Sequence, residues 1–139
     1  MDQEKMTSAQ IENLLYRESG LKGLSGLTHD MRTLEASDQP EARQAIDYFV
    51  FRFRRELGAM CAVLGGLDAL VFCGGIGENS ASIRSGVCAG MDWIGLTVDE
   101  RRNRSNEPHI SAGKTPVFVI KTDEERVIAR SVTEFLETP

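Results

Sequence analysis

Hydrophobic residues recur at helical spacing in several segments of the chain, and two short continuous apolar runs lie between these segments. The helical pattern predicts helices over residues 8–19, from about 40 to 64, from about 80 to 90 and from about 123 to 136. The continuous runs at residues 69–73 and 117–120 are typical of buried strands. From residue 38 onward the predicted order is helix, strand, helix, strand, helix. This alternation favours parallel strands covered by helices, and therefore an α/β fold.

Capping signals mark the starts of three of these helices. Thr7 and Gln10 have the spacing of a capping box, and Thr122 and Glu125 repeat it before the last helix. Pro40 follows two further start signals and suits the first turn of the long helix.

The long helix is predicted to carry the main hydrophobic core. Its apolar stripe consists of Ile46, Phe49, Val50, Phe53, Leu57, Met60, Cys61 and Leu64. Arg52, Arg54 and Arg55 fall largely off this stripe. We therefore interpret these arginines as a solvated face rather than as a ligand site.

Three segments have no sustained period. Residues 20–37 are predicted to form a long loop, of a length that often carries function. The segment WIGLTVD, residues 93–99, predicts a short strand, and the polar residues 100–116 predict an exposed connection with one helical turn.

Composition and charge exclude several classes of protein. A chain of 139 residues with 41% hydrophobic residues is expected to form one compact unit. The net charge of −5, with basic residues scattered among acidic ones, offers no surface for nucleic acid. The N-terminus is polar and no apolar run approaches the roughly 20 residues of a membrane span, so no membrane association is expected. Three cysteines without metal-ligand spacing predict a reduced, cytoplasmic protein.

The run LDALVFCGGIGENSASIRSG, residues 67–86, is the strongest candidate for chemistry. An apolar strand there opens into a glycine-rich turn at Gly74, Gly75 and Gly77, and Asn79 and Ser80 are suitable caps for a following helix. Such an arrangement binds phosphate groups through backbone N–H donors. The same pattern is also that of an ordinary strand-to-helix turn, and local chemistry leaves both interpretations open.

A second strand-to-helix turn, TDEER at residues 122–126, follows the second predicted strand. Because ligands gather at the carboxyl ends of parallel strands, both turns are expected to face the same crevice. Glu124 could hold Mg²⁺ there, directly or through water. The alternative is that acidic residues in a first helical turn only complement the helix dipole.

The two predicted strands are too few for a stable sheet. Sheets usually need several strands before their faces and edges are satisfied. We therefore expect the chain to expose apolar surface and to associate with other chain segments or with a second copy.

Three segments of the sequence together resemble the acetate kinase family of acyl-phosphate-forming kinases. They are FCGGIGENSASIRSG, SGLTHDMRTLEAS and IKTDEERVIAR, and the similarity extends over nearly the whole chain. The resemblance implies part of a ribonuclease H-like, actin-like ATPase domain, with helices around an incomplete, mostly parallel sheet. Residues 1–139 resemble only the C-terminal, nucleotide-binding third of the family, so the N-terminal domain is expected to be absent from this chain.

The resemblance also implies site residues for ATP or ADP and for Mg²⁺. The nucleotide site is carried over onto Asp30, Met31, Arg32, Gly75, Ile76, Gly77, Glu78 and Asn79. Glu124 matches the family's magnesium-linked carboxylate, although Asp123 stands where Asn is more usual before it. His29 departs from the family pattern, and neither it nor His109 is equated with a functional histidine.

The activity implied is phosphoryl transfer between ATP and acetate to form acetyl phosphate. The family's acceptor pocket, transition-state arginines and catalytic acid resemble sequence that would precede Met1, so no catalytic residue is assigned and the isolated chain is expected to be inactive. A homodimer is expected from the family. Two alternatives stay open: a propionate or butyrate kinase fragment, and a stand-alone nucleotide-binding or dimerisation module without catalysis.

Overall fold

The computed structural model describes residues 6–137, without the side chains of Glu124 and Glu137. The chain divides into two compact units, Met1–Gly66 (unit 1) and Leu67–Pro139 (unit 2). The expectation of one compact unit, drawn from length alone, is therefore wrong.

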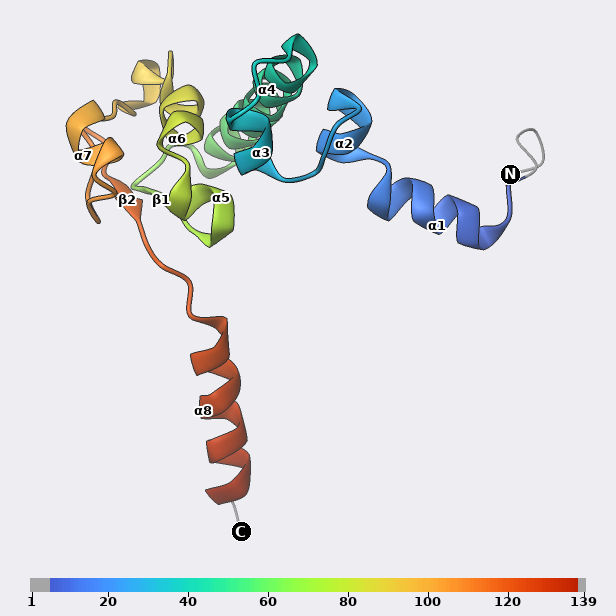
Figure 1. Ribbon diagram of the computed structural model, residues 1–139. Coiled ribbons are helices and arrows are strands. Elements are labelled where there is room, and N and C mark those ends of the chain that lie inside the picture. Colours follow the sequence, from blue (N-terminus) through green and yellow to red (C-terminus); the bar gives the residue numbers. More distant parts are fainter. Residues whose placement is uncertain (1–5, 138–139) are drawn as a thin grey trace. The chain divides into compact units, whose positions relative to one another are not determined.

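Unit 1 consists of helices. They are α1 (Ser8–Arg17), α2 (Gly20–Ser25), α3 (Met31–Glu35) and α4 (Pro40–Leu64) (Figure 1). The capping box at the start of α1 is confirmed, because the Thr7 hydroxyl accepts from the Gln10 N–H and the Gln10 side chain accepts from the Thr7 N–H.

The prediction of a long loop over residues 20–37 is wrong. That segment folds into α2 and α3, whose six and five residues are too short to show a repeating apolar pattern. Leu34 of α3 is buried with Ala42 and Ala45 of α4, and Leu21 and Ile46 pack against them. The core of unit 1 therefore lies where α2 and α3 cover the first turns of α4.

The predicted extent of α4 is confirmed, but its apolar stripe is only partly buried: Cys61 is buried, and Ile46, Phe49, Val50 and Leu57 are half-buried. Phe53, Met60 and Leu64 are exposed, the last by 72%. Within the described chain, α2 and α3 pack against α4 near its beginning, and most side chains of its later turns are exposed. The predicted solvated face is confirmed for Arg52 and Arg55, which are exposed and pair with exposed Glu56, whereas Arg54 is half-buried.

Unit 2 is a mixed α/β structure around two parallel strands. In chain order it comprises β1 (Leu70–Phe72), α5 (Gly74–Asn79), α6 (Ala81–Cys88), the 3₁₀ helix η1 (Asp92–Ile94), α7 (Glu100–Arg104), β2 (Val117–Val119) and α8 (Glu124–Glu137). The two strands lie side by side (Figure 1). Leu70 lies opposite Val117 and Phe72 opposite Val119. Both predicted strands and their parallel direction are confirmed.

The predicted strand at residues 93–99 is wrong. Its first part is η1, which ends at Gly95 in the left-handed conformation (φ +80°), where the Thr115 hydroxyl donates to the Ile94 carbonyl at 2.6 Å. Only Val98 forms a bridge, to Ser111. A left-handed residue within the segment interrupts the extended backbone that a strand needs.

The core of unit 2 is built from Ile83 and Val87 of α6, Leu96, Ile110 and Val117, all nearly or fully buried. The prediction that residues 100–116 are an exposed connection holds for most side chains. It is wrong for Asn103 and Ile110, which are both completely buried. Ile110 is tied to β2 by its N–H, which donates to the Val117 carbonyl at 2.9 Å.

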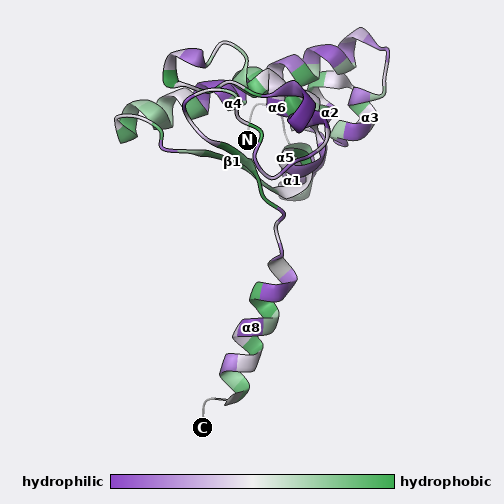
Figure 2. Ribbon diagram, turned by 90° about the vertical axis from the view of Figure 1, so that its left-hand side faces the viewer, coloured by the Kyte–Doolittle hydropathy of each residue, from purple (hydrophilic) through white to green (hydrophobic). Residues whose placement is uncertain are grey.

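Helix α8 is amphipathic, and its apolar side chains are uncovered. Val127, Ile128, Val132, Phe135 and Leu136 are all exposed. Figure 2 shows hydrophobic and hydrophilic segments interspersed along α8. The expected exposure of apolar surface is confirmed. Among the residues that the structure describes, no helix has both the length and the apolar character to cross a membrane.

Candidate functional site

The glycine-rich segment after β1 forms a helix of its own. GGIGEN is α5, where a turn was predicted, and Ser80 caps α6 by accepting from the Ile83 N–H at 3.1 Å. Gly74 is left-handed (φ +69°), and a side chain at Gly77 would lie 3.3 Å from the Phe72 carbonyl carbon. Glycine is thus favoured at residue 74 by conformation and at residue 77 by the close approach of β1.

Glu78 joins the two segments that follow the parallel strands. Its Oε1 accepts from the Thr122 N–H at 2.8 Å, the Thr122 hydroxyl at 2.9 Å and the Gly74 N–H at 2.9 Å. The Gly74 N–H is shared with the Thr122 hydroxyl oxygen at 3.0 Å. The expectation that both turns meet at the carboxyl edge of the sheet is confirmed by these bonds.

This network sets the charge of Glu78. The Thr122 N–H and hydroxyl lower the pKa of the Glu78 carboxyl, with smaller contributions from the Gly74 N–H and the Lys121 charge, while partial burial opposes them. The carboxylate is therefore ionised at neutral pH. Its negative charge lies beside the segment that the resemblance assigns to nucleotide phosphates.

Thr122 is a residue whose role sequence reasoning missed. The predicted capping box with Glu125 is wrong, because the Thr122 hydroxyl bonds to Glu78 and the Asp123 carboxylate accepts from the Arg126 N–H at 2.9 Å. The signal that could have found it was topological, since Thr122 and Glu78 both follow the carboxyl ends of strands that the pattern predicts to be parallel.

Gly75, Ile76 and Asn79 are the other residues of α5 that are predicted to bind nucleotide. A side chain added to Gly75 would meet no atom within 4 Å, and Ile76 is half-buried. The Asn79 amide donates to the Gly75 carbonyl at 2.8 Å. Asn79 thus supports α5 from within, and the backbone at Gly75 is accessible to a ligand.

Asp30, Met31 and Arg32 lie in unit 1, at the start of α3. Asp30 caps this helix by accepting from the Arg32 N–H at 2.9 Å, and this bond lowers the pKa of the Asp30 carboxyl. Met31 is buried, whereas the Arg32 guanidinium is exposed and lies 3.6 Å from Asp30. Of the three, Arg32 has the freest side chain for a ligand. The structure describes these residues within unit 1 and Gly75–Asn79 within unit 2.

Comparison with known proteins shows the family of this chain. A profile of the acetokinase family matches residues 1–130. The chain belongs to the acetokinase family. It is 60% identical over 139 residues to an acetate kinase from Methylocella silvestris, which covers 99% of this chain and 34% of that protein. An acetate kinase from Rhodopseudomonas palustris is 52% identical over 136 residues. The chain spans about a third of the length of these relatives.

Solved structures of an acetate kinase and a propionate kinase match the fold of this chain. An acetate kinase from Porphyromonas gingivalis matches with a TM-score of 0.84 and 34% identity, over 99% of this chain and 36% of that one. A propionate kinase from Francisella tularensis matches with a TM-score of 0.82, also at 34% identity, over 93% of this chain and 34% of that one. The actin-like ATPase fold predicted from sequence is thereby confirmed, and the family is one of phosphotransferases.

For an acetokinase, Mg²⁺ is the metal that the resemblance implies. Glu124 is the first residue of α8, but its side chain lies outside the described residues, so its assignment stays a prediction. Within the described part of the chain, no group of three His, Cys, Asp or Glu side chains could hold a metal ion. Glu78 Oε1 already accepts three hydrogen bonds, so only its Oε2 could face a cation.

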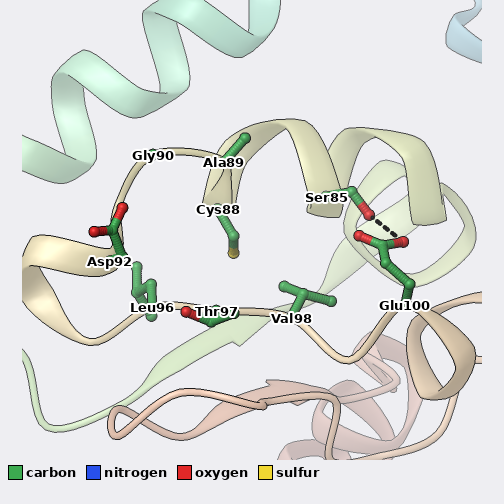
Figure 3. Close-up of a pocket in the computed structure, with 9 residues that line it drawn as sticks. All are labelled: Ser85, Cys88, Ala89, Gly90, Asp92, Leu96, Thr97, Val98 and Glu100. Carbon is green, nitrogen blue, oxygen red and sulfur yellow. Dashed lines mark hydrogen bonds between the residues drawn. The ribbon is translucent and has the colours of Figure 1, made fainter.

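A pocket of about 260 Å³ lies elsewhere in unit 2, between the end of α6 and residues 96–100 (Figure 3). The Cys88 sulfur points into it, and Ser85 donates to Glu100 at 3.0 Å. Burial, with a smaller effect of the Glu100 charge, raises the pKa of the Cys88 thiol to about 11. The thiol is therefore neutral and a poor nucleophile. None of the residues predicted to bind nucleotide lines this pocket.

Proposed function

We propose that this chain is the nucleotide-binding part of an acetate kinase, which transfers a phosphoryl group between ATP and acetate to form acetyl phosphate. The observation that carries the proposal is the junction of Gly74, Glu78 and Thr122, which fixes a glycine-rich segment at the carboxyl edge of two parallel strands. Its support is family membership and 60% identity to a protein named acetate kinase.

In this proposal the described residues bind and orient the nucleotide. The uncovered backbone at Gly75 admits phosphate oxygens because no side chain stands in their way. Arg32, exposed at the start of α3, contacts the adenosine end together with Asp30 and Met31. When bound, Mg²⁺ at Glu124 neutralises phosphate charge that would otherwise repel the Glu78 carboxylate.

In this proposal, phosphoryl transfer needs residues of a full-length acetate kinase that this chain does not supply. Transfer requires an acceptor held in line with the γ-phosphate and positive groups around the transferring oxygens. The resemblance assigns no residue of this chain to either task. We therefore propose that the 139-residue chain binds nucleotide and does not catalyse transfer alone.

The test is calorimetric titration of the chain with ADP and ATP, with and without Mg²⁺. Saturable binding that Mg²⁺ strengthens is expected. Glu124→Ala should weaken Mg-ATP more than adenosine, whereas the control Glu125→Ala, an exposed neighbour in the same helical turn, should change neither. Absence of saturable binding by a folded chain would contradict the proposal, and equal loss of adenosine in Glu124→Ala would contradict the metal role.

Acetate is proposed as the acceptor because the relatives at 60% and 52% identity are named acetate kinases. The propionate kinase structure matches at the same 34% identity as the acetate kinase from Porphyromonas gingivalis, so structural likeness does not separate the two acids. A homodimer is part of the proposal, supported by the exposed apolar side chains of α4 and α8.

A further inference from the structure

Arg84 of α6 is a completely buried cation that no predicted role accounts for. All five N–H donors of its guanidinium are used. Nε donates to Asn103 Oδ1 at 2.6 Å, Nη1 to the carbonyls of Gly77 at 2.8 Å and Glu78 at 3.0 Å, and Nη2 to the Asn103 carbonyl at 2.8 Å and Asn106 Oδ1 at 2.5 Å. Every acceptor is neutral.

A buried charge that bonds only to neutral oxygens is unusual, because buried cations are normally paired with carboxylates. Burial lowers the pKa of Arg84, but a guanidinium stays protonated at neutral pH. Replacing the arginine would leave buried carbonyls without donors, which costs more than a surface bond. Burial of the Arg84 guanidinium therefore carries a desolvation cost that only its hydrogen bonds offset.

The partner of Arg84 is itself held in one orientation. The buried Asn103 amide nitrogen donates to the Ala81 carbonyl at 2.8 Å and to the Ser85 hydroxyl at 2.7 Å. Its oxygen must therefore face Arg84. Ser85 in turn donates to Glu100, so this side of the network is anchored at both α6 and α7 (Figure 3).

The Gly77 and Glu78 carbonyls show which element the network holds in place. Gly77 and Glu78 lie in the last turn of α5, where helix carbonyls have no partner within the helix. Arg84 supplies that partner and places a positive charge where the helix end is negative. On the other side of the same residue, the Glu78 carboxylate holds Gly74 and Thr122. Arg84 thus holds the backbone of the last turn of α5, while Thr122 bonds to the Glu78 side chain and to the Gly74 N–H.

We propose that Arg84 is the positioning residue of the α5 nucleotide site: its fork holds the Gly77 and Glu78 carbonyls, and thereby keeps the Gly74–Asn79 backbone in its binding conformation. The effect of Arg84 on nucleotide binding rests on the proposed function. Its effect on the position of α5 does not depend on that function.

The test uses Arg84→Lys in the 139-residue chain, because lysine keeps the charge and loses the fork. The affinity for Mg-ADP should fall roughly tenfold, as expected for loss of one or two charged hydrogen bonds, while that for adenosine is unchanged. The Glu78 pKa, measured by NMR, should rise toward its ordinary value as α5 loosens. Arg104→Lys, an exposed arginine of the adjacent α7, is the matched control and should change none of these.

A milder variant covers the case in which Arg84→Lys does not fold. Asn106→Gly removes one acceptor, and glycine suits the left-handed backbone there (φ +50°). It should weaken Mg-ADP binding two- to threefold and raise amide hydrogen exchange within α5. Equal losses for adenosine and Mg-ADP, or an unchanged Glu78 pKa and unchanged exchange in α5, would overturn the inference. If the unaltered chain binds no nucleotide, the proposed function fails, and the Glu78 titration still decides whether Arg84 positions α5.

Discussion

Glu78 and Asp30 are carboxylates that the resemblance places in the nucleotide site, and each already accepts hydrogen bonds from backbone N–H groups. These bonds lower the pKa of both carboxyls, so both are negative at neutral pH. A nucleotide bearing several negative charges would meet repulsion from them. At the scale of single residues, this is the physical reason to expect that nucleotide binding depends on a cation.

Thr122→Val tests the junction at this scale. The change removes the hydroxyl that donates to Glu78 at 2.9 Å and accepts from Gly74 at 3.0 Å. The Glu78 pKa should move up toward its ordinary value, as followed by NMR titration of the side-chain carboxyl. Thr133→Val is the control, because that hydroxyl donates only to the Ala129 carbonyl. A Glu78 pKa that stays in place would show that the backbone N–H groups alone set it.

The same shift predicts how stability depends on pH. A carboxyl whose pKa is lower in the folded chain contributes stability that is present above its unfolded value, near 4.5, and is lost as pH falls through the folded value. Unit 2 should therefore lose stability in acid, and Thr122→Val should show less of this loss. Urea unfolding at several pH values, followed at backbone amides of unit 2, measures both.

At the scale of elements, the hydrophobic pattern predicts the strands and the longer helices and misses the short helices. Residues 70–72 and 117–119 were found as strands because continuous apolar runs are distinctive. Helices α2 and α3 complete less than two turns, so no period could reveal them. The burial of Arg84 was equally hidden, because its partners Asn103 and Asn106 are polar and lie 19 and 22 residues away. Local pattern carries no information on such pairs.

Gly74→Ala and Gly75→Ala form a matched pair for the first turn of α5. Gly74 is left-handed, and an L-residue there costs about 1 to 2 kcal/mol even though no atom lies within 4 Å. Gly75 has neither a positive φ nor a close neighbour, so Gly75→Ala should leave stability unchanged or slightly raised. Urea unfolding of unit 2 measures the difference. Equal effects of the two changes would contradict the conformational argument.

Ser80→Ala tests the start of α6. The Ser80 hydroxyl accepts from the Ile83 N–H, and loss of such a cap costs about 1 kcal/mol. Because Arg84 lies on α6, a frayed start should also raise hydrogen exchange in α5. Ser105→Ala, an exposed serine at the end of α7, is the control and should stay within about 0.5 kcal/mol of the unaltered chain.

At the scale of the whole molecule, the chain has more apolar surface than its two units cover. The sheet contains two strands, and apolar side chains of α4 and α8 are exposed. The resemblance accounts for this, since the chain spans about a third of its relatives. The small number of predicted strands correctly indicated exposed apolar surface, but the apolar pattern placed the whole α4 stripe in a core, and the described chain buries only part of that stripe.

Self-association is the prediction that belongs to this scale. Phe135 lies on the apolar side of α8, near the end of the helix, and is 80% exposed. Phe135→Asp should lower the average mass measured by sedimentation, whereas Thr133→Asp adds the same charge on the polar side and should not. A chain that sediments as a monomer of 15.4 kDa at all concentrations would contradict the proposed homodimer.

The bonds from Arg84 to Asn103 and Asn106 make the chain more sensitive to insertions and deletions between these residues than to substitutions there. Residues 85–102 connect the two sides of this network, and many of their side chains are exposed. Substitutions at the exposed positions other than Glu100, which accepts from Ser85, leave the network intact, but an inserted or deleted residue would shift Asn103 and Asn106 away from Arg84. Variation in length between α6 and α7 should therefore disturb α5 from a distance, although it alters no residue assigned to the nucleotide.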